Sequence, residues 1–81
     1  MENRVAIIGI IVEDIESAEQ INHILHEYAN VIIGRMGIPY HEKDLNIISI
    51  AIDANNDVIN SLTGKIGKLK GVSAKAVYSS K

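Results

Sequence analysis

The 81-residue chain contains no cysteine, tryptophan or phenylalanine, and only one proline. The missing cysteine excludes disulfide bonds, zinc–thiolate sites and a thiol nucleophile. A chain this short buries only about 60% of the surface that its unfolded form exposes, so its own core provides limited stability. Because disulfides are excluded, we expect the chain to gain further stability by assembling with copies of itself.

Long hydrophobic runs and a surplus of basic residues are also missing. The longest apolar run, residues 5–12, is too short to cross a bilayer as a helix. Glu2 and Arg4 balance each other before this run, so we expect no secretory signal, no membrane contact and a cytoplasmic location. The net charge of −2 argues against direct nucleic-acid binding, because phosphate contacts need an excess of Lys and Arg.

Aliphatic residues are abundant, and their spacing predicts six elements in a single domain, residues 1–81. Val- and Ile-rich segments predict strands over residues 4–12, 31–38, 45–53 and 72–79. Apolar stripes of helical period predict one helix between Asp14 and Asn30, the latter as a left-handed cap, and a second between Asn55 and Gly71. Pro39 has no N–H for a ladder, so we expect it to end the second strand.

The order of these elements predicts an α+β fold. The pattern βαββαβ forms a ferredoxin-like sandwich, in which a four-stranded antiparallel sheet carries both helices on one face. The central strands have apolar residues on both faces, so the second face would be too apolar to stay exposed on a monomer. Its candidates are Val5, Ile7, Gly9, Ile11, Leu45, Ile47 and Ala51. We therefore predict a homodimer or homotetramer joined through this sheet face or a sheet edge.

The sequence lacks an arrangement of residues typical of catalysis. The serines lie outside a G-x-S-x-G setting, and no histidine is placed to activate one, so we predict no enzyme and no cofactor. His23 and His26 have the i, i+3 spacing that can place two imidazoles on one metal, and His41 lies in a polar loop. We predict that His23 and His26 face solvent. Metal binding by the three histidines is kept as an alternative.

The segment GRMGIPY, residues 34–40, places an arginine between two glycines on the second strand. Glycines weaken a strand, unless the strand bulges or another group approaches its backbone. Arg35 shares strand parity with Ile33, so a regular strand places its guanidinium beside apolar neighbours, where it needs an acidic partner or a bound anion. Contact with a second subunit and contact with an effector are both open. The residues proposed for either role are Gly34, Arg35, Met36, Gly37 and Tyr40.

A second glycine- and lysine-containing segment, residues 63–71, superficially suggests phosphate binding. It fails the P-loop pattern, because Ile66 follows the lysine and the segment lies inside a predicted helix. Each interior glycine costs a helix about 1 kcal/mol relative to alanine. Close packing of the helix against the sheet or a second subunit would explain Gly64 and Gly67; the alternative is an anion held by Lys65, Lys68 and exposed backbone groups. Gly64 and Lys65 therefore join the candidate effector-binding or interface residues.

Three segments together resemble a known family: RVAIIGIIVED (4–14), GRMGIPY (34–40) and LTGKIGKLKGV (62–72). The chain resembles the small regulators of the iron-only hydrogenase system over nearly its whole length. This resemblance implies a ferredoxin-like, ACT-type regulatory domain, similar to the C-terminal ligand-binding domain of the nickel-responsive repressor. It implies no catalytic residues.

The chain departs from the nickel-responsive repressor in two respects. That repressor binds DNA through a separate N-terminal ribbon-helix-helix segment, whereas here we expect the first core strand by Arg4. It also binds nickel through a cysteine and strand-borne histidines, whereas this chain has no cysteine. We expect a regulator that binds a small effector, an amino acid or other anion, and acts through a separate DNA-binding regulator. A histidine-based metal sensor and a purely structural oligomerisation module are the alternatives.

Overall fold

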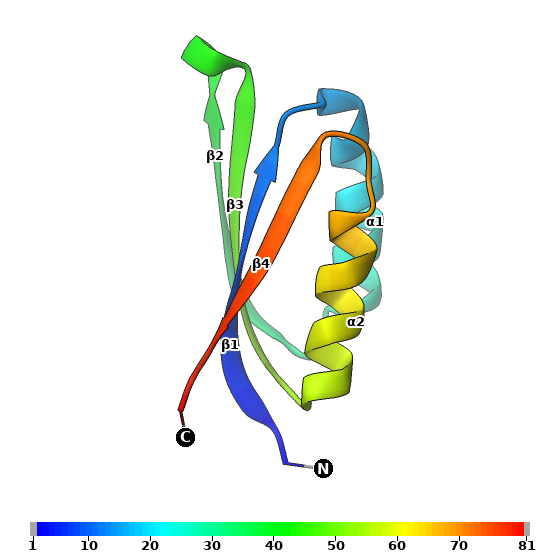
Figure 1. The fold of residues 1–81 in the computed structure, drawn as a ribbon, viewed down its shortest axis with the longest axis vertical. Helices are drawn as coiled ribbons and strands as arrows, with labels where there is room; N and C mark the ends of the chain where they lie inside the picture. The colour runs from blue at the N-terminus through cyan, green and yellow to red at the C-terminus, as the bar shows by residue number, and fades with distance from the viewer. Residues whose placement is uncertain (1, 81) are drawn as a thin grey trace.

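The chain folds as βαββαβ in a computed structural model that describes residues 2–80 (Figure 1). The strands are β1 (Arg4–Val12), β2 (Ile32–Tyr40), β3 (Leu45–Ala54) and β4 (Val72–Tyr78). The helices are α1 (Ala18–Glu27) and α2 (Asn56–Gly67), with two short 3-10 turns, η1 (Ile15–Ser17) and η2 (His41–Lys43). The two terminal residues of the predicted domain, Met1 and Lys81, lie outside the described residues.

The strands form one antiparallel sheet in the order β2-β3-β1-β4, and both helices lie on the same face of it (Figure 1). The central strands β1 and β3 are hydrogen-bonded on both sides, whereas β2 and β4 form the two edges. This arrangement confirms the ferredoxin-like prediction. Within residues 2–80, neither helix has the length and apolar character needed to cross a membrane.

The core lies between the helices and the sheet and is almost entirely aliphatic. Burial alternates along β1, where every second side chain points toward the helices. The buried apolar residues are Ala6, Ile8, Ile10, Val12, Ile21, Leu25, Ile48, Ile50, Ile52, Ala54, Ile59, Leu62 and Ile66. Burying an isoleucine contributes about 1.5–3 kcal/mol, so β1 and β3 hold much of the stabilising surface.

Strand β2 departs from regular alternation. Ile32 pairs with Ile52 and Gly34 pairs with Ala51, so a bulge places Ile33 as an extra residue in β2. The prediction that Arg35 shares a face with Ile33 is therefore wrong. The bulge shifts Arg35 into register with the buried Ile50, on the helix side of the sheet.

Element boundaries also differ from prediction, and α2, predicted to reach Gly71, ends at Gly67. Strand β2 continues through Pro39 to Tyr40, because an edge strand does not need every N–H for its ladder. Asp14 accepts a hydrogen bond from the Glu16 backbone N–H (3.0 Å) and begins η1, so α1 itself starts only at Ala18. Asn30 does not form the predicted left-handed cap, since Asp44 is the only non-glycine residue among the described ones with positive φ.

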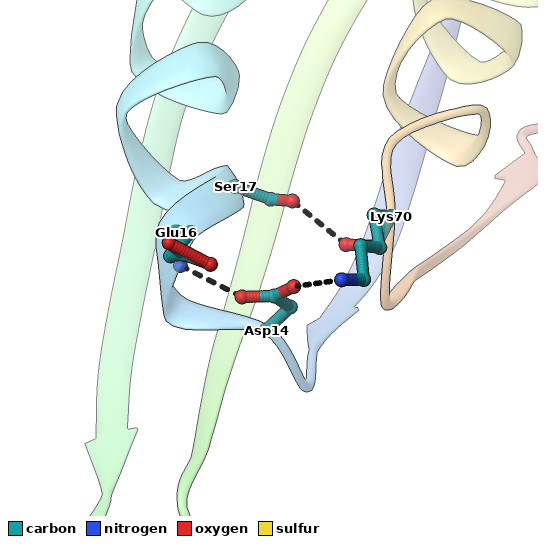
Figure 2. Close-up of polar contacts among 4 residues, drawn as sticks. All are labelled: Asp14, Glu16, Ser17 and Lys70. Carbon is teal, nitrogen blue, oxygen red and sulfur yellow. Dashed lines mark hydrogen bonds and ion pairs between the residues drawn. The ribbon is translucent and has the colours of Figure 1, made fainter.

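A polar corner joins the end of β1 to the turn before β4 (Figure 2). The buried Ser17 hydroxyl donates to the Lys70 carbonyl (2.7 Å), and Lys70 Nζ lies 3.8 Å from the Asp14 carboxylate. Gly71 accepts a hydrogen bond from the Glu13 N–H at 2.7 Å and has a left-handed φ of 68°. A Cβ on Gly71 would lie 2.7 Å from the Cβ of Asp14, so only glycine fits this position.

Substituting Gly71→Ala should destabilise the chain by about 2 kcal/mol or more, because alanine pays the left-handed backbone cost and also clashes with Asp14. Urea denaturation measures this change. Gly64→Ala is the matched control: its Cβ would meet nothing within 4 Å, and replacing a helical glycine should stabilise by up to about 1 kcal/mol. Equal stability of Gly71→Ala and the unmodified chain would contradict the steric role of Gly71.

Candidate functional site

The sheet face turned away from the helices is exposed and apolar. Val5, Ile7 and Ile11 of β1 are 44%, 51% and 38% exposed, although they lie on a central strand. The edge strands extend this surface, with Ile38 of β2 and Val77 of β4 also exposed. We call it the open sheet face. By strand register it comprises Val5, Ile7, Gly9, Ile11, Gly34, Met36, Ile38, Tyr40, Leu45, Ile47, Ser49, Ala51, Asp53, Ser73, Lys75 and Val77.

The predicted apolar second face is thus confirmed, and three of the candidate residues lie on it. Gly34, Met36 and Tyr40 alternate along β2 on this side, and Met36 is 55% exposed. A continuous apolar surface that spans four strands is typical of a protein interaction site.

The centre of the open sheet face is hollow. Gly9 of β1 pairs with Ser49 of β3 on one side and with Lys75 of β4 on the other, so small residues cross the middle of the sheet. The hollow has a volume of about 410 Å³ and is bordered by Ile11 and Ile47. We call it the central trough. Sequence reasoning missed it, and the glycine in the middle of a Val/Ile strand was its only signal.

Arg35 lies on the opposite side of β2, in a groove between this strand and α1. Its Nη2 donates to Asn22 Oδ1 of α1 at 3.1 Å, and within residues 2–80 no carboxylate pairs with the guanidinium. Two shallow clefts of about 280 Å³ each flank Arg35. One is lined by Asn22, Leu25, His26, Ala29 and Ile32, the other by Ala18, Asn22, Gly37, Ile38, Pro39, Asn46 and Ile48.

Lys65 and Gly64 belong to a third location, on α2. Lys65 Nζ lies 5.1 Å from the centre of the Tyr28 ring, and the Tyr28 hydroxyl hydrogen-bonds to Ser61 Oγ at 3.1 Å. Hydrogen bonding to Lys65, followed by that to Ser61, lowers the pKa of Tyr28, and Tyr28 raises the pKa of Lys65. The structure therefore divides the seven candidate residues among the open sheet face, the Arg35 groove and the surface of α2.

The glycines of α2 are not explained by close packing within the chain. A Cβ on Gly64 would meet nothing within 4 Å, and one on Gly67 would meet Ala74 Cβ at an ordinary 4.0 Å. The expectation of tight helix packing at these positions is wrong for contacts within the chain.

The three histidines do not form a common site within the described residues. His23 and His26 are exposed on α1, as predicted, and His41 lies in η2 at the β2–β3 connection. Over residues 2–80, no three His, Cys, Asp or Glu side chains are grouped closely enough to hold a metal ion. His26 does line one of the clefts beside Arg35.

Comparison with known proteins gives one family and two informative structures. Residues 4–76 match the family model described as "TM1266-like: Iron-only hydrogenase system regulator, putative". The structure of the uncharacterized protein TM1266 from Thermotoga maritima is similar at a TM-score of 0.91 and 35% identity, over 95% of this chain and 98% of that one. No match was found among curated proteins.

A more distant similarity shows the fold alone. The divalent ion tolerance protein CutA1 from Ehrlichia chaffeensis aligns at a TM-score of 0.51 and 15% identity, over 100% of this chain and 86% of that one. The sheet and helix arrangement described above is thus shared beyond the immediate family.

Substituting Lys65→Met should return the pKa of Tyr28 upward toward its ordinary value, because the ammonium that favours the phenolate is removed. NMR titration of the Tyr28 ring measures this value. A lowered pKa contributes stability above pH 10 that is lost as the pH falls through the folded-state pKa, so the variant should lose this alkaline contribution. Lys68→Met, at the C-cap of α2, should leave the pKa of Tyr28 unchanged; an equal effect of both variants would contradict the contact.

Proposed function

Because the chain belongs to the iron-only hydrogenase system regulator family, we propose that it is a regulatory protein and not an enzyme. In this proposal the chain assembles with copies of itself, binds a small effector and reports it to a separate DNA-binding regulator in the cytoplasm. The apolar open sheet face is the observation that carries the proposal, because a second copy could bury its exposed apolar side chains.

The apolar composition of the open sheet face favours assembly through this face. Two copies related by a two-fold axis present the same face to each other, and stacked sheets pack about 10 Å apart. Stable interfaces bury about 800 Å² per partner, which a four-stranded face can supply. Lys75 is the only basic residue on the face and lies on an edge strand. A homodimer is the smallest assembly that covers this face, and a homotetramer would use a further surface.

The Arg35 groove is the proposed contact for an anionic effector such as an amino acid. Arg35 keeps guanidinium donors beyond its bond to Asn22, and apolar residues line the clefts on both of its sides. Gly37 has no side chain to fill the second cleft. Met36 and Tyr40 are proposed as interface residues on the open sheet face. Gly64 and Lys65 are proposed as a separate contact surface on α2.

Ile7→Lys should convert the assembly to monomers, because it places a charge in the middle of the open sheet face. Size-exclusion chromatography with light scattering measures the mass. Ile7 is 51% exposed in the single chain, so the variant should still fold, as circular dichroism can check. Gln20→Lys adds the same charge on α1 and should leave the mass unchanged. A monomeric unmodified chain at micromolar concentration would refute the proposed assembly.

Arg35→Ala should remove the stabilisation that an anionic effector gives. Thermal melting in a panel of amino acids, acetate and phosphate should find at least one anion that raises the melting temperature of the unmodified chain. A ligand at a hundredfold excess over its Kd stabilises by about 2.7 kcal/mol, and the variant should lose this gain. Lys43→Ala removes an exposed charge elsewhere and should keep it. An equal shift in Arg35→Ala would exclude Arg35 as the contact.

A further inference from the structure

We propose that the central trough binds an aliphatic carboxylate, with its hydrocarbon chain along the floor of the trough and its carboxylate at Lys75. This site goes beyond the effector contact proposed for Arg35, because the two lie on opposite faces of the sheet. The apolar lining of the trough, the missing side chain at Gly9 and the single charge of Lys75 support this assignment.

The trough offers an apolar space on the open sheet face. Its floor runs over the backbone of β1 at Gly9, and Ile11 and Ile47 stand at its border. Its lining is mainly apolar, and its volume of about 410 Å³ is within the range of small-molecule sites. Removing a hydrocarbon chain from water in such a space is favourable in proportion to the apolar area that both partners bury.

Gly9 keeps this space open, and no contact among residues 2–80 requires a glycine there. Its backbone is not left-handed, and an added Cβ would meet only the Lys75 carbonyl oxygen at an ordinary 4.0 Å. Glycine weakens the interior of a strand, whereas a β-branched residue would fit the pleat and strengthen it. Glycine at position 9 therefore lowers the stability of β1 and leaves the hollow unfilled.

The charge at the border selects the chemical class of the ligand. Lys75 is the only charged residue lining the trough, and it has no ion pair within the described residues. Ser49 and Ser73 also line the trough, and neither carries a charge. A ligand with an apolar chain and one negative head group matches this arrangement, whereas a cationic head group would be repelled by Lys75.

The position of Lys75 also keeps the site reachable. Because β4 is an edge strand, the Lys75 end of the trough reaches the border of the sheet. In the proposed assembly a second copy lies over the open sheet face, and a ligand would reach the trough from this edge.

NMR titration of the isotope-labelled full chain with sodium octanoate, kept below its micelle concentration, tests the site. Octanoate should shift the backbone amide signals of Gly9, Ser49, Ser73 and Lys75, while octylammonium of the same chain length should bind at least about fivefold more weakly. Gly9→Val should abolish binding and melt at or above the temperature of the unmodified chain, so the loss would not reflect unfolding. Lys75→Gln should raise the Kd about fivefold, the effect expected for one exposed ion pair.

Arg35→Ala is the matched control: it should leave the octanoate-induced shifts of the trough residues unchanged, which separates this site from the proposed effector groove. Equal binding of octanoate and octylammonium would overturn the proposal, as would unchanged binding to Gly9→Val. If octanoate shifts no trough residue while Gly9→Val changes the mass of the assembly, a side chain of a second copy fills the trough and the proposal fails. The masses measured for Ile7→Lys test the proposed assembly independently.

Discussion

The structure depends on one constraint: its two central strands are apolar on both faces, while its two helices cover only one. β1 and β3 bury alternate isoleucines beneath α1 and α2 and present the remaining ones to solvent. Within the described residues both helices lie on one face, so the other face of the sheet is exposed in the single chain. The proposals for assembly and for the central trough both follow from this imbalance.

The sequence predicted the architecture well because strand and helix periodicity is local information. It could not place Arg35, because the bulge at Ile33 is fixed by how β2 pairs with β3 and not by β2 alone. The trough could not be predicted for the same reason. Gly9 is visible in the sequence, but Ser49 and Lys75, which pair with it, lie on strands far along the chain. The grouping of candidate residues therefore needed the structure.

Three glycines show how differently one residue type acts. Gly71 is fixed by geometry, since its left-handed backbone and its approach to Asp14 leave no room for a side chain. Gly9 has ordinary geometry and defines an empty space on the open sheet face. Nothing in the single chain explains Gly64, which lies exposed on α2. Only the first of these roles concerns folding of the chain alone.

The bulge in β2 determines which surface of the domain each of its side chains joins. It places Arg35 toward α1 and Met36 toward the open sheet face, so neighbouring residues of one strand belong to two separate surfaces. Strand register has a period of two, and a slip of one residue past the bulge would exchange the sides of these two side chains. The groove and the open sheet face are therefore connected by adjacent residues of a single edge strand that lies outside the buried core.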